Sequence, residues 1–159
     1  MAYRRTERVV ARLAARHEAI IAAARALAGE KGMSAVQIVP VAERAGIASG
    51  TVYRYFPSKE DLVAALVGAT AEQEIAAIRG AVTAAPGPLS ALAAAVMAFA
   101  GRALRERRLA SAMLAGPADG DAAAERLAFR RSLADELAGR ILAATQSGHL
   151  PDQDAAFAA

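Results

Sequence analysis

A short run in the first half of the chain carries side chains that suit contacts with a polyanion. It comprises Ser49, Thr51, Tyr53, Arg54 and, a little further on, Lys59. Hydroxyl, phenol and guanidinium groups hydrogen-bond base edges and phosphate oxygens, and such contacts specify and position a protein on DNA. These residues are candidate nucleic-acid contacts.

The residues around them have the spacing of a helix-turn-helix. Ala42 is a small side chain where two helices would cross, Gly46 follows four positions later, and Val52 six positions after that. The turn needs a backbone angle that a Cβ would obstruct, and the second helix needs one buried aliphatic side chain. The spacing is a weak signal alone, but helix-breaking residues on both sides make it strong.

The sequence offers little for other kinds of chemistry. It has no cysteine, which excludes disulfides, thiolate zinc sites and a cysteine nucleophile. His17 and His149 have no acidic residues at metal-site spacing, so we expect ordinary surface or capping roles for them. No phosphate loop or paired carboxylates are evident. We therefore expect a protein that is not an enzyme and that uses no metal and no cofactor.

The composition favours helices, and the charge is uneven along the chain. Hydrophobic residues make up 55% and aromatic residues 4%, with Ala, Leu, Arg and Glu abundant. Residues 1–60 carry a net charge of +5 and residues 61–159 a net charge of −2, which gives the overall +3. A basic first third is consistent with a polyanionic partner and equally with an ordinary solvated surface.

The periodicity of hydrophobic residues and the positions of helix-breaking residues predict where the helices lie. We expect helices over residues 12–30, 39–45, 49–56, 59–82, 89–107 and 121–146, with a shorter apolar piece at 109–114 and a helix start after Asp154. Their predicted inner faces include Ile20, Leu27, Leu62 and Leu66 early in the chain. In the later helices they are Leu92, Val96, Phe99 and Ala103, then Leu127, Ala134, Leu137 and Ile141.

Membrane insertion and export are not predicted. The longest apolar stretch, residues 89–100, is shorter than the roughly 20 residues that span a bilayer. The N-terminal residues are charged throughout and do not form a signal peptide. We expect a soluble, cytoplasmic protein.

The stretch AGIASGTVYRYFPSKEDL, residues 45–62, resembles the TetR (tetracycline repressor) family of transcriptional regulators. The shared features are a glycine turn, a Gly-Thr-aliphatic-Tyr recognition helix, an aromatic pair and a Ser-Lys-acidic-acidic-Leu helix start. The resemblance implies an all-α fold. The implied fold has two domains. Residues 1–58 would form a three-helix helix-turn-helix DNA-binding domain with an N-terminal arm, and residues 59–159 a helical effector-binding and dimerisation domain.

The resemblance also implies roles for individual residues. Thr51 and Tyr53 would contact DNA, Ser49 and Gly50 would approach the bases, and Tyr53 and Lys59 would hold phosphates. Tyr55 is a further candidate, whereas Phe56 is expected to pack in the core. The family often has polar or basic groups on the helix before the turn, where this chain has Val39 and Pro40, and this leaves Gln37 as the nearest candidate there.

Two further groups have open alternatives. Arg4, Arg5, Arg8 and Arg12 form either a flexible arm that reaches DNA or a solvated tail. Met97, Phe99, Met113 and Phe129 line either an effector pocket, as the resemblance suggests, or the plain hydrophobic core.

The C-terminus departs from the family pattern. The family dimerises through two last helices, and this chain stops at Ala159 where the first of them would begin. Either the chain is truncated, which we favour, or it dimerises through another surface such as helix 121–146. A homodimer is expected for the family but is doubtful at this chain length, and an uncovered hydrophobic face would favour ill-defined association.

These observations predict a sequence-specific DNA-binding regulator, mainly a repressor. Its partners would be a palindromic double-stranded operator and a small hydrophobic effector. The alternative is a helical protein-interaction module with impaired dimerisation and no specific DNA binding. Salt dependence separates the two, because phosphate binding weakens steeply as salt rises.

Overall fold

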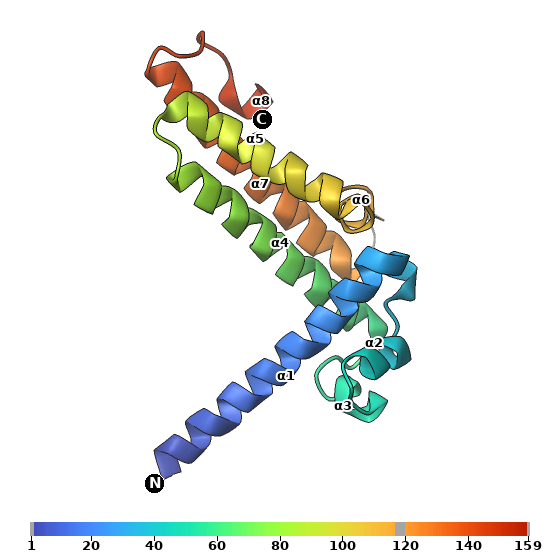
Figure 1. Ribbon diagram of the computed structural model, residues 1–159. Coiled ribbons are helices and arrows are strands. Elements are labelled where there is room, and N and C mark those ends of the chain that lie inside the picture. Colours follow the sequence, from blue (N-terminus) through green and yellow to red (C-terminus); the bar gives the residue numbers. More distant parts are fainter. Residues whose placement is uncertain (1, 117–119, 159) are drawn as a thin grey trace.

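The computed structural model describes residues 2–116 and 120–158, with side chains described for 7–116, 120 and 122–158. These residues form α-helices joined by short turns and one 3-10 segment, without a β-strand among them, which confirms the all-α prediction (Figure 1). The elements are α1 (Ala2–Lys31), η1 (Met33–Ala35), α2 (Ile38–Arg44), α3 (Ser49–Tyr53), α4 (Lys59–Thr83), α5 (Pro88–Arg105), α6 (Arg107–Ala115), α7 (Asp121–Gln146) and α8 (Ala155–Ala158). Of the helices described, none combines the length and hydropathy needed to cross a bilayer.

Local signals fix most helix ends close to their predicted positions. Ser58 caps α4: its hydroxyl accepts the Asp61 N–H at 3.0 Å, and the Asp61 carboxylate accepts the Ser58 N–H at 2.9 Å. This reciprocal pair satisfies two donors that a helix start otherwise leaves without partners. Gly148 follows α7 with a φ of +73°, and α7 has the predicted bounds.

Gly46 makes the turn between α2 and α3. Its φ is +64°, in the left-handed region that costs an L-residue with a Cβ roughly 1–2 kcal/mol. No heavy atom lies within 4 Å of the position that a Cβ would take, so the requirement for glycine is one of backbone conformation rather than space. The structure thus confirms why the turn needs glycine.

Gly46→Ala is therefore expected to lower the free energy of unfolding by about 1–2 kcal/mol, measured by urea denaturation. Gly139→Ala is the matched control, because Gly139 lies in the middle of α7 with open space around it. There alanine should be neutral or stabilise by up to about 1 kcal/mol. Equal effects at the two positions would contradict the argument.

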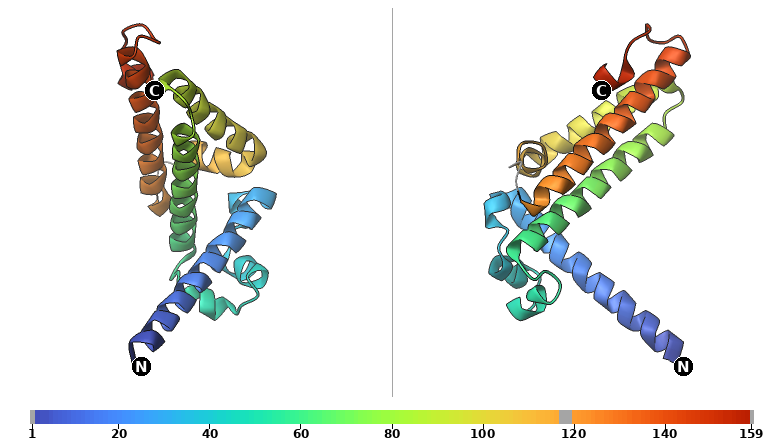
Figure 2. Two further views of the ribbon diagram at one scale, coloured as in Figure 1. Left: turned by 60° about the vertical axis from the view of Figure 1, so that its left-hand side comes forward. Right: turned by 180° about the vertical axis from the view of Figure 1, so that it is seen from behind.

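Long helices form the body of the molecule, and α1 projects from it. α4 packs against both α5 and α7 along the bundle, while α2 and α3 lie at one end near the start of α4 (Figures 1 and 2). The N-terminal half of α1 extends away from the bundle at that same end. Residues 7–19 of α1 are all exposed, and burial begins at Ile20.

Within the described part of the chain, buried side chains form two hydrophobic clusters. The N-terminal core is built by α1 to α3 and also takes residues from α4 and α6. It comprises Ile20, Ile21, Ala23, Ala24, Leu27, Ala28, Val36, Ile38, Val41, Ala42, Val52, Phe56, Leu62, Leu66 and Leu109. The bundle core lies between α4, α5, α6 and α7 and includes Val67, Ile78, Ala95, Met113 and Phe129. The N-terminal core therefore depends on two residues of α4 and on Leu109, which lie beyond residue 58.

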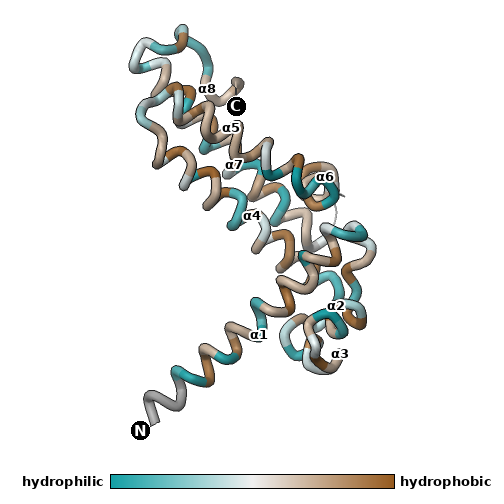
Figure 3. The backbone as a smooth tube through the Cα atoms, viewed as in Figure 1, coloured by the Kyte–Doolittle hydropathy of each residue, from teal (hydrophilic) through white to brown (hydrophobic). Residues whose placement is uncertain are grey.

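The start of the chain differs from the flexible arm expected for it. Residues 2–31 form one continuous helix, so Arg8 and Arg12 lie on a helix rather than on an arm. The physical reason is composition, because Ala, Arg, Glu and Leu are strong helix formers and no glycine or proline precedes Gly29. In Figure 3 this projecting segment carries hydrophilic and hydrophobic residues in alternation.

Two predicted inner faces are also wrong in part. On α5 the buried residues are Ala91 and Ala95, whereas Val96 is 48% exposed. On α7 Leu127 is 47% exposed, and Phe129 and Ile141 are buried. Small alanines on α5 allow it to lie close to its neighbours, and this close packing places the larger Val96 outside.

Candidate nucleic-acid interface

The two short helices of the helix-turn-helix pack against each other through the buried residues predicted for that role. Ala42 and Val52 are 1% and 0% exposed, so the two short helices cross over small and aliphatic side chains. The turn is further fixed because the Ile47 N–H donates to the Ala42 carbonyl at 3.0 Å. The inner side of α3 is thus occupied by Val52.

The outer face of α3 presents most of the candidate DNA contacts. Tyr53 is 53% exposed, and Gly50 and Arg54 are exposed as well. Ser49 and Thr51 are half-buried at the start of the helix. Because Val52 anchors the inner side of α3, the tyrosine and arginine that follow it must point outward.

Gln37 and Val39 flank this face on α2. Gln37 precedes the first residue of α2, and its side-chain amide donates to the Ser34 carbonyl at 3.1 Å. Val39 is 53% exposed and can offer only an apolar contact. Gln37 is exposed, and its bond to the Ser34 carbonyl restrains the side-chain amide.

Tyr55 and Phe56 turn away from that face toward α1. The Phe56 side chain is 3% exposed, as expected for a core residue, and its ring lies 5.0 Å from the His17 ring. The Tyr55 ring lies 6.4 Å from His17 and is half-buried against the N-terminal core. The structure therefore sets Tyr55 apart from Tyr53 and gives His17 a packing role that the sequence did not reveal.

Lys59 and Arg44 lie at the edges of the unit. Lys59 is the first residue of α4 and is half-buried. Arg44 on α2 makes a two-pronged ion pair with Glu30 on α1, one arm of which is an Nη1–Oε2 bond of 2.6 Å. Hydrogen bonds from Arg44 lower the pKa of the Glu30 carboxyl. This pair links α2 to α1, so the Arg44 guanidinium is already engaged within the molecule.

Arg4 and Arg5 lie in α1 by their backbone. Their side chains are outside the part of the chain that the structure describes.

The predicted pocket residues fall into two groups. Phe99, Met113 and Phe129 border a cavity between α4, α5, α6 and α7. Met97 does not, because it lies on the outer side of α5 with its side chain 71% exposed, and the prediction for it is wrong. The space open to a water-sized molecule is about 20 Å³, roughly the room for one water. A larger molecule can enter only if the wall moves.

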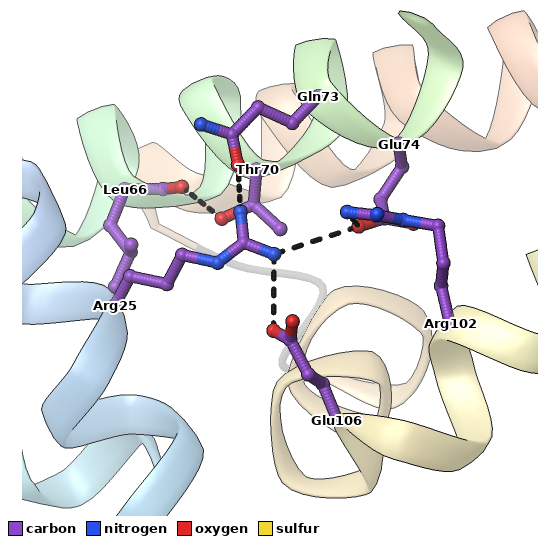
Figure 4. Close-up of polar contacts among 7 residues, drawn as sticks. All are labelled: Arg25, Leu66, Thr70, Gln73, Glu74, Arg102 and Glu106. Carbon is purple, nitrogen blue, oxygen red and sulfur yellow. Dashed lines mark hydrogen bonds and ion pairs between the residues drawn. The ribbon is translucent and has the colours of Figure 1, made fainter. Parts of the chain in front are cut away.

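A cluster of charged residues forms the polar rim of this cavity, and the sequence did not reveal it. Arg102 on α5 holds both oxygens of Glu74 on α4, at 2.7 and 2.8 Å. Arg25 on α1 lies 3.7 Å from Glu74 and donates to Glu106 at 3.0 Å, and it also bonds Gln73 (Figure 4). Hydrogen bonds to Glu74 raise the pKa of Arg102. The cluster joins α1, α4 and α5 beside the cavity.

α6 adds apolar and polar contacts to the same junction. Leu109 belongs to the N-terminal core and also borders the cavity. Arg108 donates to the Glu30 carbonyl near the end of α1 at 2.5 Å. The cavity wall and the helix-turn-helix unit therefore share α6.

Among the side chains that the structure describes, no group of three His, Asp or Glu residues could hold a metal ion.

Solved structures share this fold, in which a helix-turn-helix with an exposed second helix is joined through a long helix to a helical bundle. FadR from Bacillus halodurans, a fatty acid degradation regulator, superposes with a TM-score of 0.74 at 22% identity, covering 89% of this chain and 77% of that one. The transcriptional regulator FadR from Bacillus subtilis, solved in complex with stearoyl-CoA, gives a TM-score of 0.74 at 24% identity with the same coverage.

Sequence comparison finds proteins similar to the N-terminal unit. Residues 20–66 match the family described as bacterial regulatory proteins, tetR family. The HTH-type transcriptional repressor KstR of Mycolicibacterium smegmatis is 49% identical over 53 residues, which is 33% of this chain and 26% of that repressor. KstR of Rhodococcus jostii is 54% identical over 48 residues, 30% of this chain and 23% of the relative. The helix-turn-helix of this chain is thus similar to that of the tetR family, and the chain spans about a quarter of the length of these relatives.

Proposed function

We propose that the protein is a sequence-specific DNA-binding transcriptional regulator that acts as a ligand-responsive repressor. One observation carries this: the outer face of α3, with Tyr53, Arg54 and Gly50 exposed, lies inside the segment that matches the TetR family and its repressors. In this proposal Thr51, Tyr53 and the start of α3 read bases, and Lys59 holds a phosphate. Residues 1–58 form the DNA-binding domain and residues 59–159 the regulatory domain.

The partners follow from the same proposal. The operator is a palindromic duplex read by a homodimer, since paired half-sites add affinity and spacing specificity. The effector is a small hydrophobic molecule that enters the cavity bordered by Phe99, Met113 and Phe129. Stearoyl-CoA in the Bacillus subtilis FadR complex is a precedent for an effector with an apolar chain. The repressor would act in the cytoplasm.

The structure supports a route from effector to DNA. The cavity has room for about one water, so an effector must displace its walls. One wall is α6, which contributes Leu109 to the N-terminal core and bonds the end of α1 through Arg108. Another is α4, whose first turn follows directly after α3. In this proposal, movement of either wall changes the orientation of α3 relative to the bundle and so releases the DNA.

The first experiment is selection of bound duplexes from a random library with the purified protein at moderate salt. An enriched palindrome supports a sequence-reading dimer. An enriched half-site supports DNA reading without the proposed dimer. Absence of enrichment, together with binding that does not depend on salt, overturns the proposal in favour of a protein-interaction module.

Thr51→Ala and Tyr53→Ala are each expected to weaken binding to the selected DNA about 5- to 150-fold, the range that corresponds to a lost base or phosphate contact of about 1–3 kcal/mol. Fluorescence anisotropy with a labelled duplex measures this, and circular dichroism checks the fold. Thr83→Ala is the matched control: it is an exposed threonine at the far end of α4. Unchanged binding by both α3 variants would show that α3 does not read the DNA.

A further inference from the structure

The exposed half of α1 carries a row of arginines. Arg8, Arg12 and Arg16 follow at intervals of four residues, and all three are exposed. On an α-helix this spacing places successive side chains about 6 Å apart along the axis and about 40° apart around it. The three guanidinium groups therefore form one stripe along the projecting helix. Glu7 and Glu18 lie about 140° and 120° around the helix from Arg12, the middle of this stripe.

These arginines have no partners among the side chains that the structure describes. Within residues 7–116, 120 and 122–158, none of the three makes an ion pair or a side-chain hydrogen bond. The arginines of the bundle contrast with this. Arg79 and Arg102 pair with carboxylates, and Arg108 and Arg130 donate to backbone carbonyls. Three uncommitted like charges on one stripe repel each other, and an external anion would relieve that repulsion.

The arginine stripe starts next to the helix-turn-helix, with Arg16 beside His17 in the sequence. His17 packs on Phe56, just after α3, with 5.0 Å between the ring centres. From that point α1 continues outward beyond the unit, at the end of the molecule that carries α3 and away from α5 and α8 (Figures 1 and 2). DNA lying across the exposed face of Tyr53 and Arg54 would run past this helix.

We propose that Arg8, Arg12 and Arg16 bind the phosphate backbone of the duplex beside the segment that α3 reads. This inference rests on the proposed DNA-binding function and extends it to a second, sequence-independent contact surface. One DNA strand carries a phosphate about every 3.4 Å of helix axis, so arginines about 6 Å apart can each reach a separate phosphate. A helix holds them in register at lower entropic cost than a flexible arm.

The test is the salt dependence of binding by Arg8→Gln/Arg12→Gln/Arg16→Gln. Glutamine keeps the helix propensity and removes the charge. For a duplex with flanks of about ten base pairs, the slope of log affinity against log salt is expected to fall by about 2.7, since each lost phosphate contact contributes about 0.9. The fall in this slope should be equal for selected and random sequences, because phosphate contacts carry no sequence information. Trimming the flanks should reduce the wild-type slope similarly and leave the variant's slope unchanged.

Controls separate the possible failures. Arg105→Gln/Arg107→Gln/Arg131→Gln removes the same charge from exposed positions of the bundle and should leave the slope unchanged. If the wild-type protein fails to bind DNA, the proposed function itself fails. If it binds and the α1 variant keeps the wild-type slope, the α1 surface is not a DNA contact. The α1 variant could instead change only the oligomeric state, measured by sedimentation. That result would show that α1 contacts a second copy of the chain, with the exposed Val9 and Leu13 as apolar contacts, and would also overturn the inference.

Discussion

Replacing Leu109 by alanine is expected to lower the free energy of unfolding by about 2–5 kcal/mol, the usual cost of a large-to-small change in a closed core. The side chain is 2% exposed and lies in the N-terminal core, although α6 is far from that core in the sequence. It also borders the cavity, so the change enlarges the space beside the bundle core as well.

Urea denaturation with two probes measures this. All three tyrosines lie within the first 60 residues, so their fluorescence follows the N-terminal unit, while circular dichroism follows the whole helical fold. We expect both transitions to shift to lower urea together. Leu104→Ala is the control, because Leu104 is 64% exposed and should change stability by less than about 0.5 kcal/mol. A tyrosine transition that keeps its midpoint would show that α6 does not support the N-terminal unit.

Glu74→Ala is expected to cost about 1–3 kcal/mol, because it leaves two guanidinium groups facing each other without their shared carboxylate. The Glu74 side chain is 13% exposed, and those of Arg25 and Arg102 are 20% and 30% exposed, so solvent screens the pair only in part. The loss should also loosen α1 against the bundle, since Arg25 retains only Gln73 and the more exposed Glu106.

Thermal or urea unfolding provides the measurement, with Glu72→Ala as the matched control on the same helix. Glu72 is exposed and makes no ion pair in the described structure. The double variant Glu74→Leu/Arg102→Leu should regain part of the loss, because apolar residues can replace a partly buried ion pair. If Glu74→Ala were as stable as the control variant, the cluster would contribute nothing to the junction.

Features set by neighbouring residues could be predicted from the sequence. The bounds of α7, the Ser58 cap and the positive φ of Gly46 depend on residues within one or two turns of each other. The burial of Val52 follows from its place in a recognisable turn. Local rules are sufficient in these cases, because the energies involved come from short-range hydrogen bonds and backbone sterics.

Features set by distant residues could not be predicted. The partners of Arg25 lie between 48 and 81 residues away, and no spacing in the sequence relates them. On α5, alanines on several sides left the inner face ambiguous, and close packing selected Ala91 and Ala95 over larger neighbours. The same contrast holds for the candidate site. The outer face of α3 could be predicted from the local sequence pattern. The orientation of Tyr55 toward His17 could not, because it depends on the path of α1.

The contribution of Leu109 to the N-terminal core also has a consequence during synthesis on the ribosome. At about 5–20 residues per second, roughly 2–9 s separate the synthesis of Leu66 from that of Leu109. Until Leu109 has left the exit tunnel, the nascent helix-turn-helix exposes apolar surface that α6 later covers. The unit should therefore gain its full stability late in translation, and the growing chain should be a substrate for chaperones in that interval.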